Sequence, residues 1–380
     1  MIYKDFKGLK LSNLGFGTMR LPVIDGKDKC IDKDLAEKMF ARAIEAGVNY
    51  FDTAWGYHGG NSELVTGEIL SNYDRDSFYL ATKFPGYDLS NMPKVEEIFE
   101  RQLEKLRTDH FDFYLIHNVC EMNIDEYLNP KHGVQEYLIR QRENGRIKHL
   151  GLSSHGRAST LKRYLDIWGS EMEFCQLQVN YIDWEFQKAA DGVALLKEKG
   201  IPLWVMEPVR GGLLARLSEE NAAKLKELRP DESSVAWAFR YLQTIPETKV
   251  ILSGMTDLAQ VEDNLRTFET EKPLTDREQE VLSGIASDML SKKILPCTAC
   301  RYCTEYCPQE LDIPYLLSLY NDYEFTGGGY TPVMRGLALS EDKQPSACIG
   351  CASCEQVCPQ QIGISGAMSD FAEKLKKGFV

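Results

Sequence analysis

The chain lacks long apolar runs and any excess of basic residues. None of its apolar stretches reaches the roughly 20 residues that a membrane-spanning helix needs. Its formal net charge is -13, so the positive field that attracts nucleic acid or an anionic membrane is missing. Charges at Lys4, Asp5 and Lys7 interrupt the segment where a secretory signal needs an apolar core. We therefore predict a cytoplasmic protein that binds neither nucleic acid nor a membrane.

Cysteine, by contrast, is abundant, with 11 residues in the chain. In an intracellular protein such residues are metal or redox ligands more often than disulfide partners. Eight of them fall in two short motifs after residue 296. We expect the other three, Cys30, Cys120 and Cys175, to be small buried apolar side chains.

The first 270 residues alternate between apolar runs and segments with helical periodicity. A length of 380 residues suits a barrel of about 250 residues and a smaller unit. We predict an α/β fold, with a (β/α)8 TIM barrel over 1–270, a hairpin over 2–11 at its start, and a second domain over 271–380. The expected strands are 14–19, 48–52, 78–83, 111–117, 147–154, 174–180, 201–206 and 249–253.

Polar residues occupy the ends of three successive predicted strands. Asp52, Lys83 and His117 each end an apolar run, and Tyr57 follows closely after Asp52. Runs of this kind are typical of buried parallel strands whose C-terminal ends face a pocket. Taken singly, each residue is better explained as a loop aromatic, a surface charge or a core histidine. Four of them on three successive strands indicate a shared site.

This set of side chains can perform proton chemistry on a carbonyl group. A neighbouring ammonium such as Lys83 favours the phenolate and lowers the pKa of a tyrosine, here Tyr57. Asp52 would hold the lysine charged and in place. His117 would donate a hydrogen bond to the substrate oxygen.

The segments Asn49–Tyr57, Ala81–Lys83 and Leu115–His117 resemble the aldo-keto reductases. Members of that family are TIM barrels that interconvert carbonyls and alcohols with a nicotinamide cofactor and no metal. The resemblance covers roughly residues 8 to 270. It implies that Tyr57 is the general acid or base, that Lys83 lowers its pKa, that Asp52 pairs with Lys83, and that His117 orients the carbonyl.

The resemblance also implies where NAD(P)H binds. Ser153, Ser154 and Gln178 match residues that hold the nicotinamide carboxamide, although many members have asparagine at the position of Ser154 and an aromatic residue at that of Met206. Members that prefer the 2'-phosphate often carry Lys or Arg where Ser253 and Gln260 stand, so NADH and NADPH both stay open. The expected cofactor contacts are Gly17, Thr18, Asp52, Ser153, Ser154, Gln178, Met206, Pro208, Arg210, Gly211, Gly254, Met255, Gln260, Asp263 and Asn264.

A cysteine motif occurs twice near the end of the sequence. The repeats are Cys297-x-x-Cys300-x-x-Cys303-x-x-x-Cys307-Pro308 and Cys348-x-x-Cys351-x-x-Cys354-x-x-x-Cys358-Pro359. Three closely spaced thiolates bind one cubane, and the fourth turns toward the partner cluster. The pattern resembles bacterial two-cluster ferredoxins and predicts a small α-helical domain with two [4Fe-4S] clusters. One ligand set is Cys297, Cys300, Cys303 and Cys358, and the other is Cys348, Cys351, Cys354 and Cys307.

Two alternatives concern this second domain. Structural zinc is one, since paired C-x-x-C units also form zinc ribbons. The other concerns the insert of 40 residues between Cys307 and Cys348, which is longer than a minimal ferredoxin connection and long enough to reach the barrel mouth, so the pairing of ligands across the repeat stays open. We expect a helix at 313–323 within it.

Three functions fit these motifs. The preferred hypothesis is NAD(P)H-linked carbonyl reduction or alcohol oxidation, with clusters that exchange electrons with a ferredoxin or flavoprotein partner or serve the structure. The second is a reductase driven by ferredoxin through the clusters. The third is a cofactor-binding redox sensor or partner subunit with little turnover. A nicotinamide moves electrons in pairs and a cluster moves them singly, and we find no sequence feature that indicates a flavin to connect the two.

Overall fold

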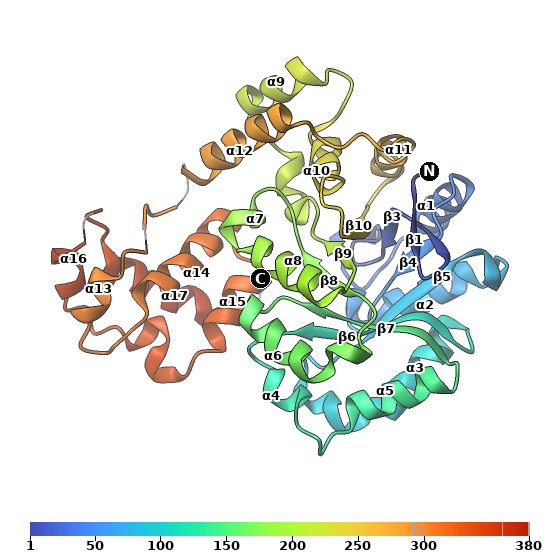
Figure 1. Ribbon diagram of the computed structural model, residues 1–380, viewed down its shortest axis with the longest axis horizontal. Coiled ribbons are helices and arrows are strands. Elements are labelled where there is room, and N and C mark those ends of the chain that lie inside the picture. Colours follow the sequence, from blue (N-terminus) through green and yellow to red (C-terminus); the bar gives the residue numbers. More distant parts are fainter. Residues whose placement is uncertain (292–293, 298, 359, 379–380) are drawn as a thin grey trace. The chain divides into compact units, whose positions relative to one another are not determined.

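The computed structural model describes residues 1–291, 294–297, 299–358 and 360–378. These residues form two compact units, Met1–Leu282 and Ser283–Val380. Figure 1 shows the first in blue through yellow and the second in orange to red. Among the described residues, no helix has both the length and the apolar character needed to cross a membrane.

The first unit is a closed barrel of parallel strands in the order β10-β3-β4-β5-β6-β7-β8-β9. This confirms the predicted TIM-barrel fold. Neighbouring strands pair in parallel register, for example Lys83 with Leu115. The barrel strands are β3 (Leu14–Gly17), β4 (Tyr50–Asp52), β5 (Tyr79–Phe84), β6 (Phe111–Val119), β7 (Ile147–Ser154), β8 (Cys175–Gln178), β9 (Leu203–Met206) and β10 (Thr248–Gly254).

Helices follow the strands and cover the outside of the barrel (Figure 1). Several begin at a polar cap: Asp32 accepts a hydrogen bond from the amide of Leu35 at the start of α1. They are α1 (Lys33–Glu45), α2 (Asn61–Leu70), α3 (Val95–Leu106), α4 (Ile124–Tyr127), α5 (Val134–Glu143), α6 (Ala158–Trp168), α7 (Asp183–Phe186), α8 (Ala189–Lys199), α9 (Glu219–Leu228), α10 (Ser234–Leu242) and α11 (Leu258–Thr267).

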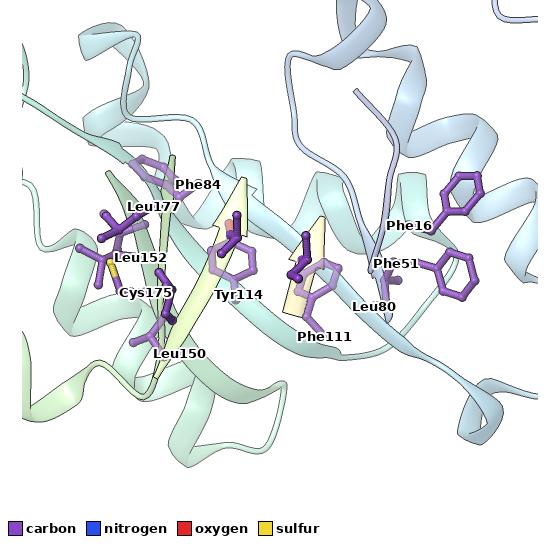
Figure 2. Packing of buried hydrophobic residues seen from close by; sticks show 14 of the residues in the cluster. Phe16, Phe51, Leu80, Phe84, Phe111, Tyr114, Leu150, Leu152, Cys175 and Leu177 are labelled. Atoms are coloured by element: carbon purple, nitrogen blue, oxygen red, sulfur yellow. The ribbon is translucent and has the colours of Figure 1, made fainter. Parts of the chain in front are cut away.

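Alternation along each strand separates two layers of side chains. Residues such as Phe16, Phe51 and Leu80 belong to the buried cluster shown in Figure 2, which includes residues of the surrounding helices. Their neighbours along the strand, such as Tyr50 and Ala81, belong to a second cluster in the lumen. The same alternation places Lys83 on the lumen side of β5.

One end of the lumen is filled by aromatic rings. The antiparallel hairpin of β1 (Tyr3–Phe6) and β2 (Leu9–Ser12) is present, as predicted. It contributes Phe6, whose ring centroid lies 5.1 Å from that of Trp204 and 5.8 Å from that of Phe113. Apolar packing thus occupies the end of the barrel that carries the hairpin.

The second unit is helical. The insert between the cysteine motifs forms α14 (Ile313–Thr326) and α15 (Tyr330–Leu337), which pack on α17 (Ile364–Lys376) through a buried cluster that includes Phe371. Gly327, with φ of 73°, ends α14 in a left-handed conformation. The remaining helices are α12 (Asp276–Ser291), which spans the boundary of the two units, α13 (Tyr302–Glu305) and α16 (Ser353–Gln356).

The three cysteines outside the motifs differ in burial. Cys120 and Cys175 are buried, but Cys30 is exposed. The expectation of burial was therefore wrong for Cys30, which lies in a loop beside the charged residues Asp28 and Lys29.

Candidate active site and cysteine cavities

Four predicted polar residues meet at the C-terminal ends of neighbouring strands. Asp52 is the last residue of β4, Lys83 lies one residue from the end of β5, and His117 lies near the end of β6. Tyr57 opens a 3-10 turn, Tyr57–Gly60, that follows β4. Because β4, β5 and β6 are adjacent in the barrel, these side chains share one site.

Lys83 is fully buried, and its ammonium has three partners. It donates to Asp52 Oδ1 at 2.6 Å, to the carbonyl oxygen of Thr53 at 2.7 Å and to the Tyr57 hydroxyl at 3.4 Å. Burial alone would lower the pKa of Lys83, but the charge of Asp52, the Tyr57 phenol and the hydrogen bonds to these two side chains outweigh it and raise the pKa. Lys83 is therefore an ammonium ion at neutral pH.

The Tyr57 hydroxyl is governed by two opposing effects. Burial raises the pKa of Tyr57, and the charge of Lys83 lowers it by a smaller amount. The charge of Lys83 lowers the pKa of Tyr57 as expected, but desolvation of the phenolate is the larger effect, so the pKa lies above its ordinary value. Tyr57 is consequently a neutral phenol, able to donate a proton.

His117 lies between two tyrosine rings. Its ring is nearly perpendicular to those of Tyr57 and Tyr87, with centroids 6.2 and 5.3 Å away. Burial, together with the positive charge of Lys83, lowers the pKa of His117 well below its usual value, so the imidazole is neutral. Its Nδ1 and the Oδ2 of Asp52 are buried and have no hydrogen-bond partner among the described residues. Both atoms can take partners from a bound molecule.

The residues expected to hold the nicotinamide carboxamide lie at the ends of β7 and β8. The Ser153 hydroxyl accepts a hydrogen bond from the amide of Asn118 at 2.8 Å, and Ser154 donates to the carbonyl of Val119 at 2.8 Å. Gln178 donates to Asp183 at 2.8 Å. Met206, at the end of β9, pairs with Gln178 in the strand register. All four thus lie at the same end of the barrel as Lys83.

Arg210 is held by a buried ion pair. Its Nε lies 2.9 Å from Oδ1 of Asp183, and both side chains are almost inaccessible to solvent. The sequence predicted that Arg210 contacts the cofactor, and the structure shows that the orientation of its guanidinium is set by Asp183. Gly211 and Gly212 beside it have φ of 62° and 89°, a backbone conformation that favours glycine. Pro208 in the same loop is buried.

Five of the predicted cofactor contacts, Gly254, Met255, Gln260, Asp263 and Asn264, lie at the end of β10, just after it and on α11. Asn264 is buried and donates to the hydroxyl of Ser253 at 3.0 Å, while Asp263 accepts from Ser233 at 2.6 Å. Gln260 is exposed and bonds to Asp257, the cap of α11, at 3.0 Å. Gly254 and Met255 connect this strand and helix, with Gly254 exposed and Met255 buried.

The other two predicted cofactor contacts lie at the end of β3. Gly17 pairs with Asp52 on one side and with Gly254 on the other. The hydroxyl of Thr18 is buried 2.7 Å from that of Ser62. Thr18 is therefore tied to α2 instead of pointing to solvent.

Asp52, Tyr57, Lys83 and His117 form a tetrad, and three residues near it were missed by sequence reasoning. Tyr87 contacts His117, and the buried pair Glu63 and Lys105 lies behind β5. For Lys105 a signal existed: helical spacing places it seven residues after Ile98, on the apolar face of α3. A charged residue on such a face requires a buried partner.

The second unit contains two cavities lined by cysteine. Cys307, Cys348, Cys351 and Cys354 line one, with about 350 Å³ of empty space that includes open solvent. Cys297, Cys300, Cys303 and Cys358 line the other, with about 320 Å³. The structure thus brings the eight cysteines together in the two crossed sets derived from the repeat.

The chemistry of these cavities fits an iron-sulfur cluster better than zinc. Tetrahedral zinc needs four sulfurs converging at about 2.3 Å from one point. Within the ranges that the structure describes, no three His, Cys, Asp or Glu residues are arranged to hold a single metal ion. Burial and the neighbouring thiols raise the pKa of Cys303 to about 11, so the thiolate form of this cysteine requires a cationic group beside it.

Known protein families match both the barrel and the cysteine-containing second unit. The aldo/keto reductase family model matches residues 13–286, and a 4Fe-4S dicluster domain model matches residues 296–362. An uncharacterized oxidoreductase, YqkF of Bacillus subtilis, is 25% identical over 307 residues, covering 73% of this chain and 93% of the relative. L-galactose dehydrogenase of Arabidopsis thaliana is 25% identical over 306 residues, covering 73% and 90%.

A solved structure extends the comparison. The holo form of aldo-keto reductase AKR11C1 from Bacillus halodurans has a TM-score of 0.59 and 27% identity, covering 73% of this chain and 93% of that one. The family match extends over more than half of the chain and includes the whole barrel. The chain therefore belongs to the aldo/keto reductase family of oxidoreductases and carries a 4Fe-4S ferredoxin-type domain in its C-terminal part.

Proposed function

We propose that the barrel reduces a carbonyl compound to an alcohol with NAD(P)H and that Tyr57 donates the proton. The observation that carries the proposal is the Tyr57 hydroxyl, a neutral phenol 3.4 Å from the buried ammonium of Lys83. When bound, the nicotinamide supplies a hydride to the carbonyl carbon. Alcohol oxidation is the same reaction in reverse.

The side chains of the site have complementary tasks in this reaction. Tyr57 transfers its proton to the substrate oxygen, while His117, as a neutral imidazole, hydrogen-bonds that oxygen. Lys83 stabilises the phenolate that forms on Tyr57 once the proton has been transferred, and Asp52 keeps Lys83 charged. General acid catalysis of this kind contributes about 10² to 10⁴ in rate.

Several features of the barrel fit a nicotinamide cofactor. The buried Oδ2 of Asp52, which has no hydrogen-bond partner among the described residues, offers an acceptor within the site. Ser153, Ser154, Gln178 and Met206 stand at the adjacent strand ends, and we assign them to the nicotinamide half. We assign the loop around Gly211 and the start of α11 to the phosphates and adenosine. Residues 1–270 would thus form the catalytic domain.

We propose further that residues 271–380 hold two [4Fe-4S] clusters, one in each cysteine cavity. A cluster exchanges single electrons when bound. Cys300 and Cys351 are exposed, which favours electron exchange with a ferredoxin or flavoprotein over a purely structural task. This observation also supports the second candidate, a reductase that receives electrons from ferredoxin.

One experiment separates these functions. Protein purified without oxygen is assayed for iron and sulfide, then titrated with NADH and with NADPH while cofactor fluorescence and cluster absorbance are followed. The same preparation is assayed with a panel of aldehydes and ketones, alongside Tyr57→Phe. Nicotinamide-dependent turnover that Tyr57→Phe loses supports the proposal. Turnover with reduced ferredoxin alone would favour the second candidate, and cofactor binding without turnover would favour a sensor.

A further inference from the structure

A second buried ion pair lies beside the catalytic tetrad. Lys105 Nζ in α3 lies 2.5 Å from Glu63 Oε2 in α2, and the side chains are 8% and 0% exposed. Burying such a pair removes two charges from water, and apolar residues of the same volume usually give similar or greater stability. Its position next to the tetrad therefore requires an explanation other than stability.

The Lys105 end of the pair supports the loop that carries Tyr57. The ammonium lies 4.6 Å from the centre of the Trp55 ring, within the range of a cation–π interaction. Trp55 precedes Tyr57 by two residues, with only Gly56 between them. Lys105 thus links this loop to α3.

The Glu63 end of the pair supports the strand that carries Lys83. Glu63 Oε1 accepts from the Thr82 hydroxyl at 2.7 Å and from Gln102 Nε2 at 2.6 Å. Thr82 immediately precedes Lys83 in β5, and Gln102 also donates to the backbone carbonyl of Lys83 at 3.0 Å. Every oxygen of the Glu63 carboxylate is therefore engaged.

The adjacent residue extends this network to the third partner of Lys83. The hydroxyl of Ser62 lies 3.0 Å from that of Thr53. The carbonyl oxygen of Thr53 accepts from Lys83 at 2.7 Å. The start of α2 is thus hydrogen-bonded both to Thr82 in β5 and to Thr53, which follows β4.

We infer that Glu63 and Lys105 are positioning residues that set the separation between the Tyr57 hydroxyl and the Lys83 ammonium. One member of the pair holds the Tyr57 loop and the other holds the Lys83 strand. At 3.4 Å this contact is at the long limit of a hydrogen bond, so a small displacement breaks it. The kinetic part of the inference rests on the proposed carbonyl reduction.

Two variants separate positioning from stability. Lys105→Met leaves the Glu63 carboxylate buried without a cation, so it is expected to lose both stability and turnover. In the double variant Glu63→Gln with Lys105→Met no charge is left unpaired, and glutamine can still bind Thr82. We expect the double variant to regain stability but to keep a kcat at least tenfold below wild type, because Trp55 has lost its cation.

A control variant tests whether a general loss of stability is enough to lower kcat. Arg75→Met removes a partly buried ion pair with Asp112, 2.7 Å long, that lies outside the tetrad. It should lower the melting temperature while kcat stays within about twofold of wild type.

The pH profile gives a readout that a loss of stability does not move. A greater distance from Lys83 weakens the positive charge that lowers the pKa of Tyr57, so the double variant should oxidise alcohols with a profile shifted to higher pH. The groups that face Tyr57 are Lys83, Asp52, His117, Tyr87 and Glu207. All of them are unchanged in both variants.

The outcomes distinguish this inference from the proposed function. A double variant with wild-type kcat and pH profile would refute the positioning role, provided that Tyr57→Phe is inactive. Full turnover by Tyr57→Phe would refute the proposed function instead. A crystal structure of the double variant gives the answer without any assay: the inference expects a Tyr57–Lys83 separation beyond hydrogen-bonding distance, and an unchanged separation would overturn it.

Discussion

Replacing Lys83 by methionine should slow carbonyl reduction far more than it weakens nicotinamide binding. The Lys83 ammonium lies 3.4 Å from the hydroxyl of Tyr57, and in the proposed reduction it stabilises the phenolate formed by proton transfer. At this distance of 3.4 Å and an effective dielectric constant of about 20, the interaction between unit charges is about 5 kcal/mol. Complete loss in the transition state would correspond to roughly 10³ to 10⁴ in rate.

The measured loss should be between about 10² and 10⁴, because water that enters the site recovers part of the interaction. Stopped-flow decay of nicotinamide fluorescence in a single turnover measures this step, and fluorescence titration measures cofactor affinity. Loss of Lys83 also leaves Asp52 without its cation, at a cost of about 3 to 5 kcal/mol in stability. The assay must therefore run well below the melting temperature of the variant.

The matched control is Lys33→Met, which removes an exposed ion pair with Glu68. Such a surface pair contributes at most about 1 kcal/mol to the free energy of unfolding, and neither residue belongs to the candidate active site. Lys33→Met should therefore keep wild-type kinetics. A rate for folded Lys83→Met within threefold of wild type would refute the role assigned to Lys83.

Three further predictions test other parts of the molecule. The pKa of Tyr57 is raised and that of His117 is lowered well below its usual value. The kcat for reduction should therefore stay level from pH 6 to pH 9 and fall only as Tyr57 loses its proton in more alkaline solution. A change in kcat near pH 6.5 that the His117→Gln variant no longer shows would contradict the neutral imidazole. Cys358→Ala should leave one cluster intact, lowering the iron content from about eight to about four atoms per chain, while an unchanged count would contradict the crossed ligand set. Phe6→Ala removes a ring packed on Phe113 and Trp204, so it should lower the free energy of unfolding by about 3 to 5 kcal/mol with kcat unchanged, as measured by denaturant titration.

The barrel was predictable because most of its strands are short apolar runs that alternate along the chain with segments of helical periodicity. Alternation along β5 and β6 places Lys83 and His117 on the lumen side, and the neighbouring strand ends bring Asp52 close to them. The two cysteine sets were predictable for a similar reason, since the repeated spacing and trailing proline leave one simple crossed arrangement.

Properties that depend on burial or on distant partners were not predictable. The pKa of Tyr57 is the balance of desolvation and the charge of Lys83, and the sequence reveals only the second. Arg210 is oriented by Asp183, which lies 27 positions earlier in the chain and was not singled out. The pairing of Glu63 with Lys105 joins two helices, and the sequence shows at most that such charges fall on apolar faces.

The most direct test of the account is a single turnover of Tyr57→Phe with saturating nicotinamide and carbonyl substrate. Tyr57→Phe retains the aromatic ring and removes only the hydroxyl that lies next to Lys83. We predict normal cofactor affinity and a rate of hydride transfer at least 10² below wild type, since the proposed reaction takes its proton from the Tyr57 hydroxyl. Hydride transfer at the wild-type rate would contradict the central claim that this phenol is the proton donor.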